Sequence, residues 1–138
     1  MDILKAISIE EVETAFGGEI PERHPHSYIE SRLRDEMLFI VQSDDNKIIG
    51  CLIYDIWWGN TPFIEYVNVL EQHQRKGTGL ALLNAAKQDL KSKGFDQAIS
   101  STELSNPLGL GFHDKAGFKK LESLNFPHGE EQFYIMDL

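Results

Sequence analysis

Two glycines, Gly77 and Gly79, stand between a strand-like run and the clearest helical pattern in the chain. The run before them, PFIEYVNVL, is rich in β-branched and aromatic residues, and the segment after them repeats leucine and alanine along one helical stripe. A helix that begins directly after a strand leaves its first backbone N–H groups without intrahelical partners, and glycines keep side chains away from them. The junction therefore predicts an anion-binding site at a helix N-terminus.

Two common phosphate-binding motifs do not fit this junction. A P-loop needs Gly-Lys-Ser/Thr four residues after an earlier glycine, whereas here the order is Lys76-Gly77-Thr78 and the earlier glycine is missing. A dinucleotide fingerprint needs a third glycine where Leu82 stands, and the chain is too short for two mononucleotide-binding halves. These mismatches disfavour a nucleotide-binding regulator.

The size and composition of the chain indicate a single domain over residues 1–138. Its 138 residues, of which 41% are hydrophobic, suit one globular core. The apolar runs are too short for a membrane span, and the N-terminus lacks a basic segment followed by an apolar one. We therefore expect a cytoplasmic protein that does not insert into a membrane.

The formal net charge of −9 argues against nucleic acid as a partner, because proteins that bind phosphate backbones usually present basic surfaces. The charge is also unevenly distributed. Residues 1–66 carry 13 acidic and 5 basic side chains, net −8, whereas residues 71–120 carry 5 acidic and 8 basic side chains, net +3. This asymmetry fits either solvated surface or an anionic ligand beside the second segment and a cationic one beside the first.

Hydrophobic periodicity and turn residues predict an α/β (α+β) fold in the order ααβββαβαββ, with a mixed central β-sheet flanked by helices. Ser8, with Glu11 three residues later, has the spacing of a capping box, and Gly94 is typical of a helix C-terminus. The first three strands are expected to be antiparallel, and the third, the next helix and the next strand to form a right-handed crossover. The predicted elements are helices at 8–16 and 27–36, strands at 37–43, 46–58 and 62–70, a helix at 80–93, a strand at 97–104, a helix at 107–117, and strands at 118–124 and 131–138.

Two stretches resemble the GCN5-related N-acetyltransferases. Residues 74–79, which follow a strand ending in Val69, resemble that family's Gln/Arg-x-x-Gly-x-Gly/Ala pyrophosphate loop. Residues 106–118 resemble its downstream pattern Asn-x-x-Ala-x-x-x-Tyr-x-x-x-Gly-Phe. Two positions depart from this pattern, because Gly109 replaces the usual alanine and His113 the usual tyrosine.

The resemblance covers roughly residues 46–120 and implies transfer of an acetyl group from acetyl-CoA to an amine within a ternary complex. Backbone N–H groups of residues 74–79 would bind the pyrophosphate, and nearby basic side chains would add charge. Backbone at the end of the preceding strand would hold the thioester through a β-bulge. The residues expected to bind acetyl-CoA are Val69, Leu70, Gln74, Arg75, Lys76, Gly77, Thr78, Gly79 and Asn106.

Glu65 is the candidate general base, since several family members carry a base glutamate four residues before the position of Val69. A carboxylate there could remove the ammonium proton directly or through water, and it would also attract the cation. Strand alternation predicts that Glu65 shares a face with the apolar Val67 and Val69, which an ordinary surface glutamate would not explain. The alternative is a solvent-facing strand residue.

His113, at the tyrosine position of the family pattern, is the candidate acid that protonates the departing thiolate. Free thiols have a reference pKa of about 8.5, so an acid would assist the leaving group at neutral pH. A histidine ring can donate through one N–H even when it is neutral. The alternatives are a partly exposed His113 with no chemical role, and an acid supplied by Tyr134 or by water.

The acceptor is expected to be a primary amine, and the acidic first segment favours a cationic one. Candidates are a small molecule such as a polyamine or aminoglycoside, a lysine, or a peptide N-terminus. The alternative function is a non-catalytic acyl-CoA-binding sensor or structural module, which the missing tyrosine favours. His24 and His26 lack a further placed ligand, so no metal is predicted, and the two closing strands could support a homodimer.

Overall fold

The computed structural model describes residues 1–21 and 24–138 of the chain. Residues 22–23 belong to the predicted loop between the first two helices and lie outside the described residues. Among the helices described, none has the length and apolar character needed to span a membrane.

A seven-stranded mixed sheet forms the centre of the domain, with the strand order β1-β2-β3-β4-β5-β7-β6. Neighbouring strands pair antiparallel, except β4 and β5, which run parallel. The predicted mixed sheet and its antiparallel first half are thereby confirmed. The strands are Asp2–Lys5 (β1), Leu38–Gln42 (β2), Ile48–Trp57 (β3), Thr61–Val69 (β4), Gln97–Glu103 (β5), Lys119–Phe126 (β6) and Gly129–Asp137 (β7).

Four α-helices are described: Ile9–Ala15 (α1), His26–Arg34 (α2), Thr78–Ser92 (α3) and Pro107–Ala116 (α4). A 3₁₀ turn, Glu71–His73 (η1), precedes α3. The Ser8 hydroxyl accepts a hydrogen bond from the Glu11 N–H and the Glu11 carboxylate accepts one from the Ser8 N–H, so the predicted capping box is present. Gly117 ends α4 in the left-handed region at φ 86°, a conformation that favours glycine.

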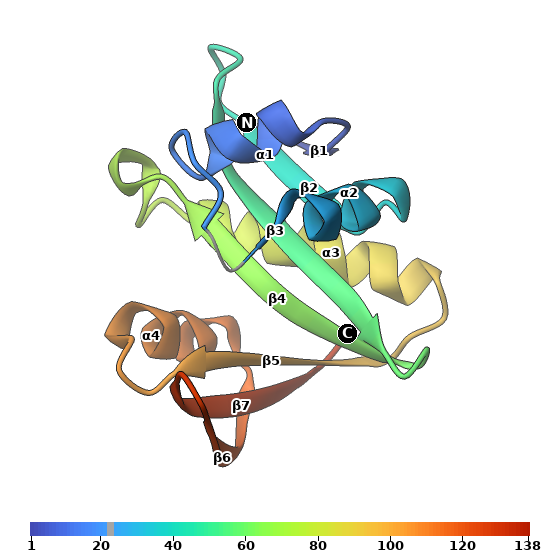
Figure 1. Ribbon diagram of the computed structural model, residues 1–138, viewed down its shortest axis with the longest axis vertical. Helices are drawn as coiled ribbons and strands as arrows, with labels where there is room; N and C mark the ends of the chain where they lie inside the picture. Colours follow the sequence, from blue (N-terminus) through green and yellow to red (C-terminus); the bar gives the residue numbers. More distant parts are fainter. Residues whose placement is uncertain (22–23) are drawn as a thin grey trace.

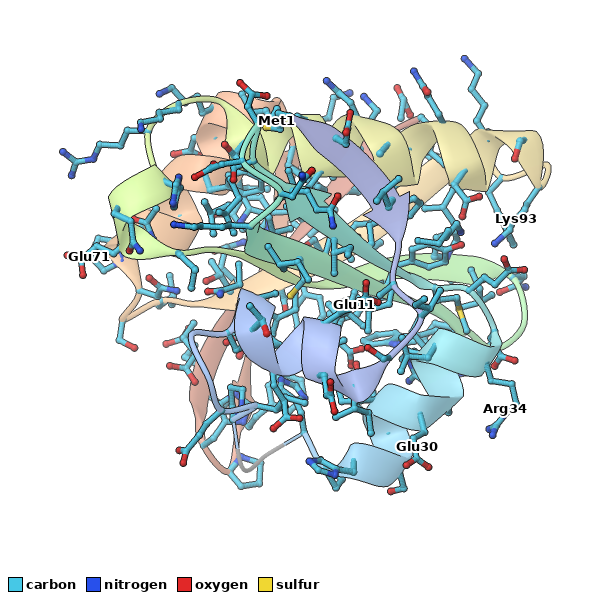
Figure 2. All side chains as sticks on the ribbon, turned by 90° about the horizontal axis from the view of Figure 1, so that it is seen from above. Met1, Glu11, Glu30, Arg34, Glu71 and Lys93 are labelled. Atoms are coloured by element: carbon cyan, nitrogen blue, oxygen red, sulfur yellow. The ribbon has the colours of Figure 1, made fainter. Side chains whose placement is uncertain are left out.

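The helices cover both faces of the sheet (Figure 1, Figure 2). On one face, α1 and α2 pack over a core that includes Ile29 and Cys51. On the other face, Leu83 of α3 and Phe112 of α4 pack with Leu52 in a second core. Because β2 and β3 lie between two helical layers, most of their residues are buried.

The predicted order omits β1. This strand has only four residues, and it forms at the edge of the sheet by pairing with β2, Ile3 opposite Val41. Four residues carry too little alternation to be distinguished from a loop, so the pairing partner rather than the local pattern specifies the strand. The other predicted elements are present, and their boundaries differ by a few residues.

The opposite edge strand, β6, is the most exposed of the described strands. Leu121, Leu124 and Phe126 expose 40–52% of their surface. The pairing with β7 shifts register between Lys120 and Ser123, which marks a bulge. Bulges interrupt the regular hydrogen-bonding edge that strand-to-strand association needs, which disfavours pairing through β6. The homodimer through the closing strands stays a prediction.

Candidate active site

The site lies where β4 and β5 separate. The two strands pair only through Phe63 with Ile99 and Ile64 with Ser100, and beyond these pairs their C-terminal ends diverge (Figure 1). A cleft of about 1380 Å³ opens there. Single-ligand pockets usually measure roughly 300–1,000 Å³, so this cleft has room for two substrates to meet.

The cleft opens on both faces of the sheet. Ser100 and Thr102 of β5 point toward α4, where Ser100 contacts His113. Strand alternation sends Ser101 and Glu103 to the opposite face, the one that carries α1 and α2. All of these residues line the cleft. Ligands can therefore approach one another from two sides.

We call the opening beside α3 and α4, formed by Gln74, Arg75 and residues 77–80, 106–109 and 111–113, the helix mouth. We call the opening on the α1 and α2 face the acidic mouth, which is formed by Glu65, Glu103, His128 and Glu131. The helix mouth is built largely from backbone and the acidic mouth from titratable side chains.

The helix mouth exposes the N-terminus of α3. Gly77 adopts φ 80° as the N-cap, no side chain caps the helix, and its first turn holds no acidic residue. The first N–H to bond within the helix is that of Ala81, which donates to the Gly77 carbonyl at 3.0 Å. The amides of residues 78–80 thus remain available, as the glycine junction predicts for an anion site.

Gly79 is closely packed at this mouth. A Cβ atom added to it would lie 3.0 Å from Phe112 Cε1 and 3.7 Å from Val67 Cγ1. The first distance is tighter than ordinary van der Waals contact, so even a methyl group at this position would require the Phe112 ring of α4 to shift by a few tenths of an ångström. A larger side chain would press harder on α4 beside the free amides.

The other residues predicted to bind the cosubstrate occupy different positions. The Gln74 side chain donates to the Val69 carbonyl at 2.9 Å, which ties the loop to the end of β4. Arg75 is exposed at φ 63° and lines the cleft. Lys76 is also exposed but does not line the cleft, and neither does Leu70.

Asn106 caps α4 at the helix mouth. Its side chain accepts a hydrogen bond from the Gly109 N–H at 3.2 Å and donates to Thr102 Oγ1 at 3.3 Å. A Cβ atom at Gly109 would collide with Thr102 Oγ1. The glycine that replaces the alanine of the family pattern is therefore explained by the close contact between α4 and β5.

Glu65 occupies a β-bulge in the middle of β4. Ile53 of β3 pairs with Tyr66 and the next residue, Tyr54, pairs with Ile64, so Glu65 has no partner across the strands. The resemblance implied a bulge near the end of this strand, around Val69 and Leu70. The structure instead places this register shift at Glu65.

The bulge overturns the predicted orientation of Glu65. The side chain extends toward Arg32 of α2, and the next residue, Tyr66, packs into the core on that same face. Val67 and Val69 pack into the core on the α3 face. The extra residue interrupts the alternation, so the expectation that Glu65 shares a face with these valines is wrong.

The Glu65 side chain is 24% exposed, and one cation lies near its carboxyl. Its Oε2 atom accepts no hydrogen bond from the described residues, and Arg32 Nε lies 4.0 Å away. The guanidinium of Arg32 donates instead to Asp55 at 2.9 Å and stacks over the Tyr28 ring. Burial raises the pKa of Glu65 to about 7. Such a carboxyl can take up a proton at neutral pH.

His113 is buried, with 6% of its surface exposed, which contradicts the alternative of a partly exposed helix residue. Its Nε2 lies 2.8 Å from Ser100 Oγ and its Nδ1 lies 2.7 Å from the Gly109 carbonyl oxygen. Burial lowers the pKa of His113, although the hydrogen bond to Gly109 opposes this shift. Both ring nitrogens therefore have partners within the protein.

Tyr134 lies beneath the His113 ring, with centroids 4.3 Å apart. It is fully buried and does not line the cleft, and its hydroxyl contacts no hydrogen-bonding group among the described residues. Burial raises the pKa of Tyr134. The tyrosine thus supports the imidazole ring rather than facing a substrate.

The acidic mouth is completed by the turn between β6 and β7. His128 Nε2 lies 2.8 Å from a Glu131 carboxylate oxygen and 3.9 Å from one of Glu103. These three groups are close enough to share a metal ion. Because they are accessible and pair with one another, we assign no metal to them.

Three parts of the site were not predicted from the sequence: Arg32, Ser100 and the pair Glu103 and Glu131. Arg32 and Ser100 belong to ordinary amphipathic patterns and carry no motif. The two glutamates meet only through the pairing of β5 with β7, where Glu103 is opposite Glu131. The one available sequence signal concerned Ser100, because strand alternation places this polar residue on the inward face of its strand.

Comparisons with known proteins agree with this geometry. Residues 6–118 match the Acetyltransferase (GNAT) family. A relative from Sulfurisphaera tokodaii, named N-alpha-acetyltransferase, is 26% identical over 131 residues, which cover 85% of this chain and 78% of the relative.

Two solved structures share the fold. Ard1 from Thermoplasma volcanium superposes with a TM-score of 0.83 at 16% identity, over 99% of this chain and 97% of that one. A GNAT family acetyltransferase from Elizabethkingia anophelis, solved with acetyl-CoA bound, superposes with a TM-score of 0.65 at 23% identity, over 88% and 93% of the two chains.

Proposed function

The chain belongs to the GNAT acetyltransferase family and is an N-acetyltransferase, and we propose that it acetylates the α-amino group of a cationic peptide or protein N-terminus. The observation that carries this proposal is Glu65, a cleft-lining carboxyl whose Oε2 accepts no hydrogen bond from the described residues and whose pKa burial raises to about 7. It lies on the acidic mouth, where a positively charged acceptor would enter.

The pKa of Glu65 favours an α-amine over a lysine. An α-ammonium group has a reference pKa of about 7.7–8.0, within roughly one unit of Glu65, whereas a lysine ammonium has a pKa of about 10.4. Proton transfer to Glu65 is therefore easier from an α-ammonium than from a lysine ammonium. The relatives named N-alpha-acetyltransferase support the same acceptor.

The helix mouth fits the cosubstrate. The free amides of residues 78–80, together with Gly77, suit the pyrophosphate of acetyl-CoA, and Arg75 adds a cation at the edge of the cleft. Bound acetyl-CoA would supply an activated acetyl thioester. Val69, Gln74 and Asn106 shape the loop and helix ends around it.

Two residues transfer protons in this proposal, Glu65 as the base and His113 as the acid. Glu65 attracts the acceptor, removes its ammonium proton and so exposes the nitrogen lone pair. His113 supplies a proton on the opposite side of the cleft, where the leaving group departs. Tyr134 does not line the cleft, so water is the remaining alternative to His113.

The carboxylates of Glu103 and Glu131 strengthen the preference for a positively charged acceptor. They lie on the same face of the sheet as Glu65, and residues 1–66 add a net charge of −8. Such a field attracts cations and raises their local concentration. We further propose that the protein works in the cytoplasm, without nucleic acid as a partner.

A panel of amines tests the proposal, with released CoA thiol as the readout. It contains a basic peptide with a free N-terminus, the same peptide with a blocked N-terminus and an internal lysine, a polyamine and an aminoglycoside. We expect the free N-terminus to react at least about tenfold faster than the others. A faster lysine or small-molecule substrate would contradict the acceptor, and no turnover with any amine would favour the acyl-CoA-binding module.

A further inference from the structure

A chain of buried polar groups crosses the point where β4 and β5 separate. The Gly109 carbonyl contacts His113 Nδ1 at 2.7 Å, His113 Nε2 contacts Ser100 Oγ at 2.8 Å, and Ser100 Oγ contacts the Ile64 carbonyl at 2.9 Å. Ile64 and Ser100 form the last pair between the two strands. The chain therefore runs from α4 to the apex of the cleft.

The number of protons in this chain depends on the charge of His113. A carbonyl oxygen can only accept, so Nδ1 carries a proton and Nε2 of the neutral ring faces Ser100 with a lone pair. Ser100 has a single O–H, which can donate either to Nε2 or to the Ile64 carbonyl. Two protons thus serve three contacts when the ring is neutral, and all three contacts are satisfied only when the ring is protonated.

We propose that Ser100 is a catalytic residue that relays the proton of His113 to the cleft. This inference rests on the proposed function, because it names the partner of the proposed acid. Ser100 is 3% exposed and lines the cleft beside His113. Nδ1 is bonded to Gly109 and one ring face is covered by Tyr134, so Nε2 is the nitrogen that can exchange a proton.

The proton step balances through the serine. The charged ring gives its Nε2 proton to Ser100 Oγ as the Ser100 hydroxyl turns from the Ile64 carbonyl and gives its own proton to the departing sulfur. One N–H bond breaks, one S–H bond forms, the serine is regenerated, and His113 is left neutral with its proton on Nδ1. A proton from solvent then recharges the ring, which balances the ammonium proton that Glu65 removes from the acceptor and releases to solvent.

The surroundings of His113 define what else can affect its charge. Tyr134 from β7 stacks on the ring, Phe118 packs 4.9 Å from it, and Asp114 follows it in α4. Tyr134 and Asp114 are the titratable groups that face it among the described residues, and Asp114 favours the charged ring. Neither lies within the hydrogen-bonded chain.

Nitrogen-15 NMR of histidine-labelled protein without ligands tests the inference independently of activity. In the wild-type protein, we expect neutral His113 to carry its proton on Nδ1. In Ser100→Ala, the Nε2–H of the charged ring loses its acceptor, so the titration midpoint of His113 should move to lower pH. The matched control is Ser101→Ala, on the other face of β5, which should leave that midpoint unchanged.

An Nε2–H tautomer in the wild-type protein would overturn the inference without any variant. An unchanged His113 midpoint in Ser100→Ala would overturn it as well. In turnover assays, Ser100→Ala should lower kcat by roughly tenfold or more, and a wild-type rate would contradict the relay. If the NMR results are as expected but no amine is acetylated, the proposed function fails while the pairing of Ser100 with His113 stands.

Discussion

The two mouths of the cleft are built in different ways. The helix mouth uses backbone amides from one continuous segment, residues 77–80, which adjoin a glycine in the left-handed region. The acidic mouth uses side chains from β4, β5, β7 and the turn before β7, brought together by strand pairing. A site made of backbone is specified locally, whereas a site made of side chains depends on the register of the whole sheet.

The two mouths also differ in whether their charges depend on pH. The amides of α3 hold fixed partial charges that do not titrate, so the helix mouth should bind an anion over a wide pH range. The acidic mouth depends on Glu65, whose pKa is raised by burial to about 7. Substitution of Glu65 in the acidic mouth should therefore reduce kcat, whereas substitutions in the helix mouth should weaken acetyl-CoA binding.

The largest effect is expected from Glu65→Gln, which keeps the size of the side chain and removes the base. We expect kcat for a basic peptide to fall by about 1,000-fold, within the range seen for loss of a positioned base. Affinity for acetyl-CoA, measured by calorimetric titration, should not change because the helix mouth is intact. A kcat within threefold of wild type would show that Glu65 is not the base.

The pH profile of the wild-type enzyme should show the next largest effect. Glu65 acts only when deprotonated, so kcat/KM should fall about tenfold per unit as the pH drops below about 7, the pKa to which burial raises this carboxyl. The rate at pH 5 would then be about 100-fold below the plateau. Glu65→Gln should abolish this acidic limb, and a wild-type limb centred near the ordinary value for glutamate would contradict the role of burial.

Gly79→Val tests the helix mouth alone. The new side chain would press against Phe112 beside the free amides, so acetyl-CoA should bind about 30-fold more weakly, or about 2 kcal/mol. Asn84→Val is the matched control, since it introduces the same side chain at an exposed position of α3 that does not line the cleft, and it should change affinity less than twofold. Equal affinities for acetyl-CoA in the two variants would contradict binding of the pyrophosphate at this junction. Circular dichroism checks that both retain the fold.

The smallest effect is expected from Glu131→Gln at the rim of the acidic mouth. The Glu131 side chain is 15% exposed and pairs with the more exposed His128, and its charge acts on the acceptor by attraction alone, so KM for a basic peptide should rise about threefold with kcat unchanged. The dependence of kcat/KM on salt concentration should weaken, because one steering charge is lost. A neutral peptide serves as the control substrate and should show no change. A KM effect of the same size on both peptides would contradict electrostatic attraction.

The sequence could predict the helix mouth because its determinants are local. The strand, the Gly77 and Gly79 pair and the following helix are adjacent in the chain, and the structure preserves that arrangement. The same holds for the capping box at Ser8. Alternating hydrophobicity likewise predicted most of the sheet, and β1 was missed because four residues do not establish a period.

The acidic mouth could be predicted only in part. Glu65 was found by its distance from Val69, but its orientation was predicted wrongly because a bulge shifts the alternation by one residue. Nothing in the local sequence marks that bulge. The pairing of Glu103 with Glu131, and of Ser100 with His113, depends on contacts between elements, which periodicity does not encode.

The close contact between Gly109 and Thr102 has a consequence for how this chain can change over time. Restoring the family's alanine at position 109 would collide with the threonine and bring a methyl group within 2.9 Å of Asn106 Nδ2, at the residue whose carbonyl contacts His113. Replacing Thr102 with a smaller residue removes the shortest of these contacts. In an evolving lineage, a change at the strand position therefore favours a later change at the helix position.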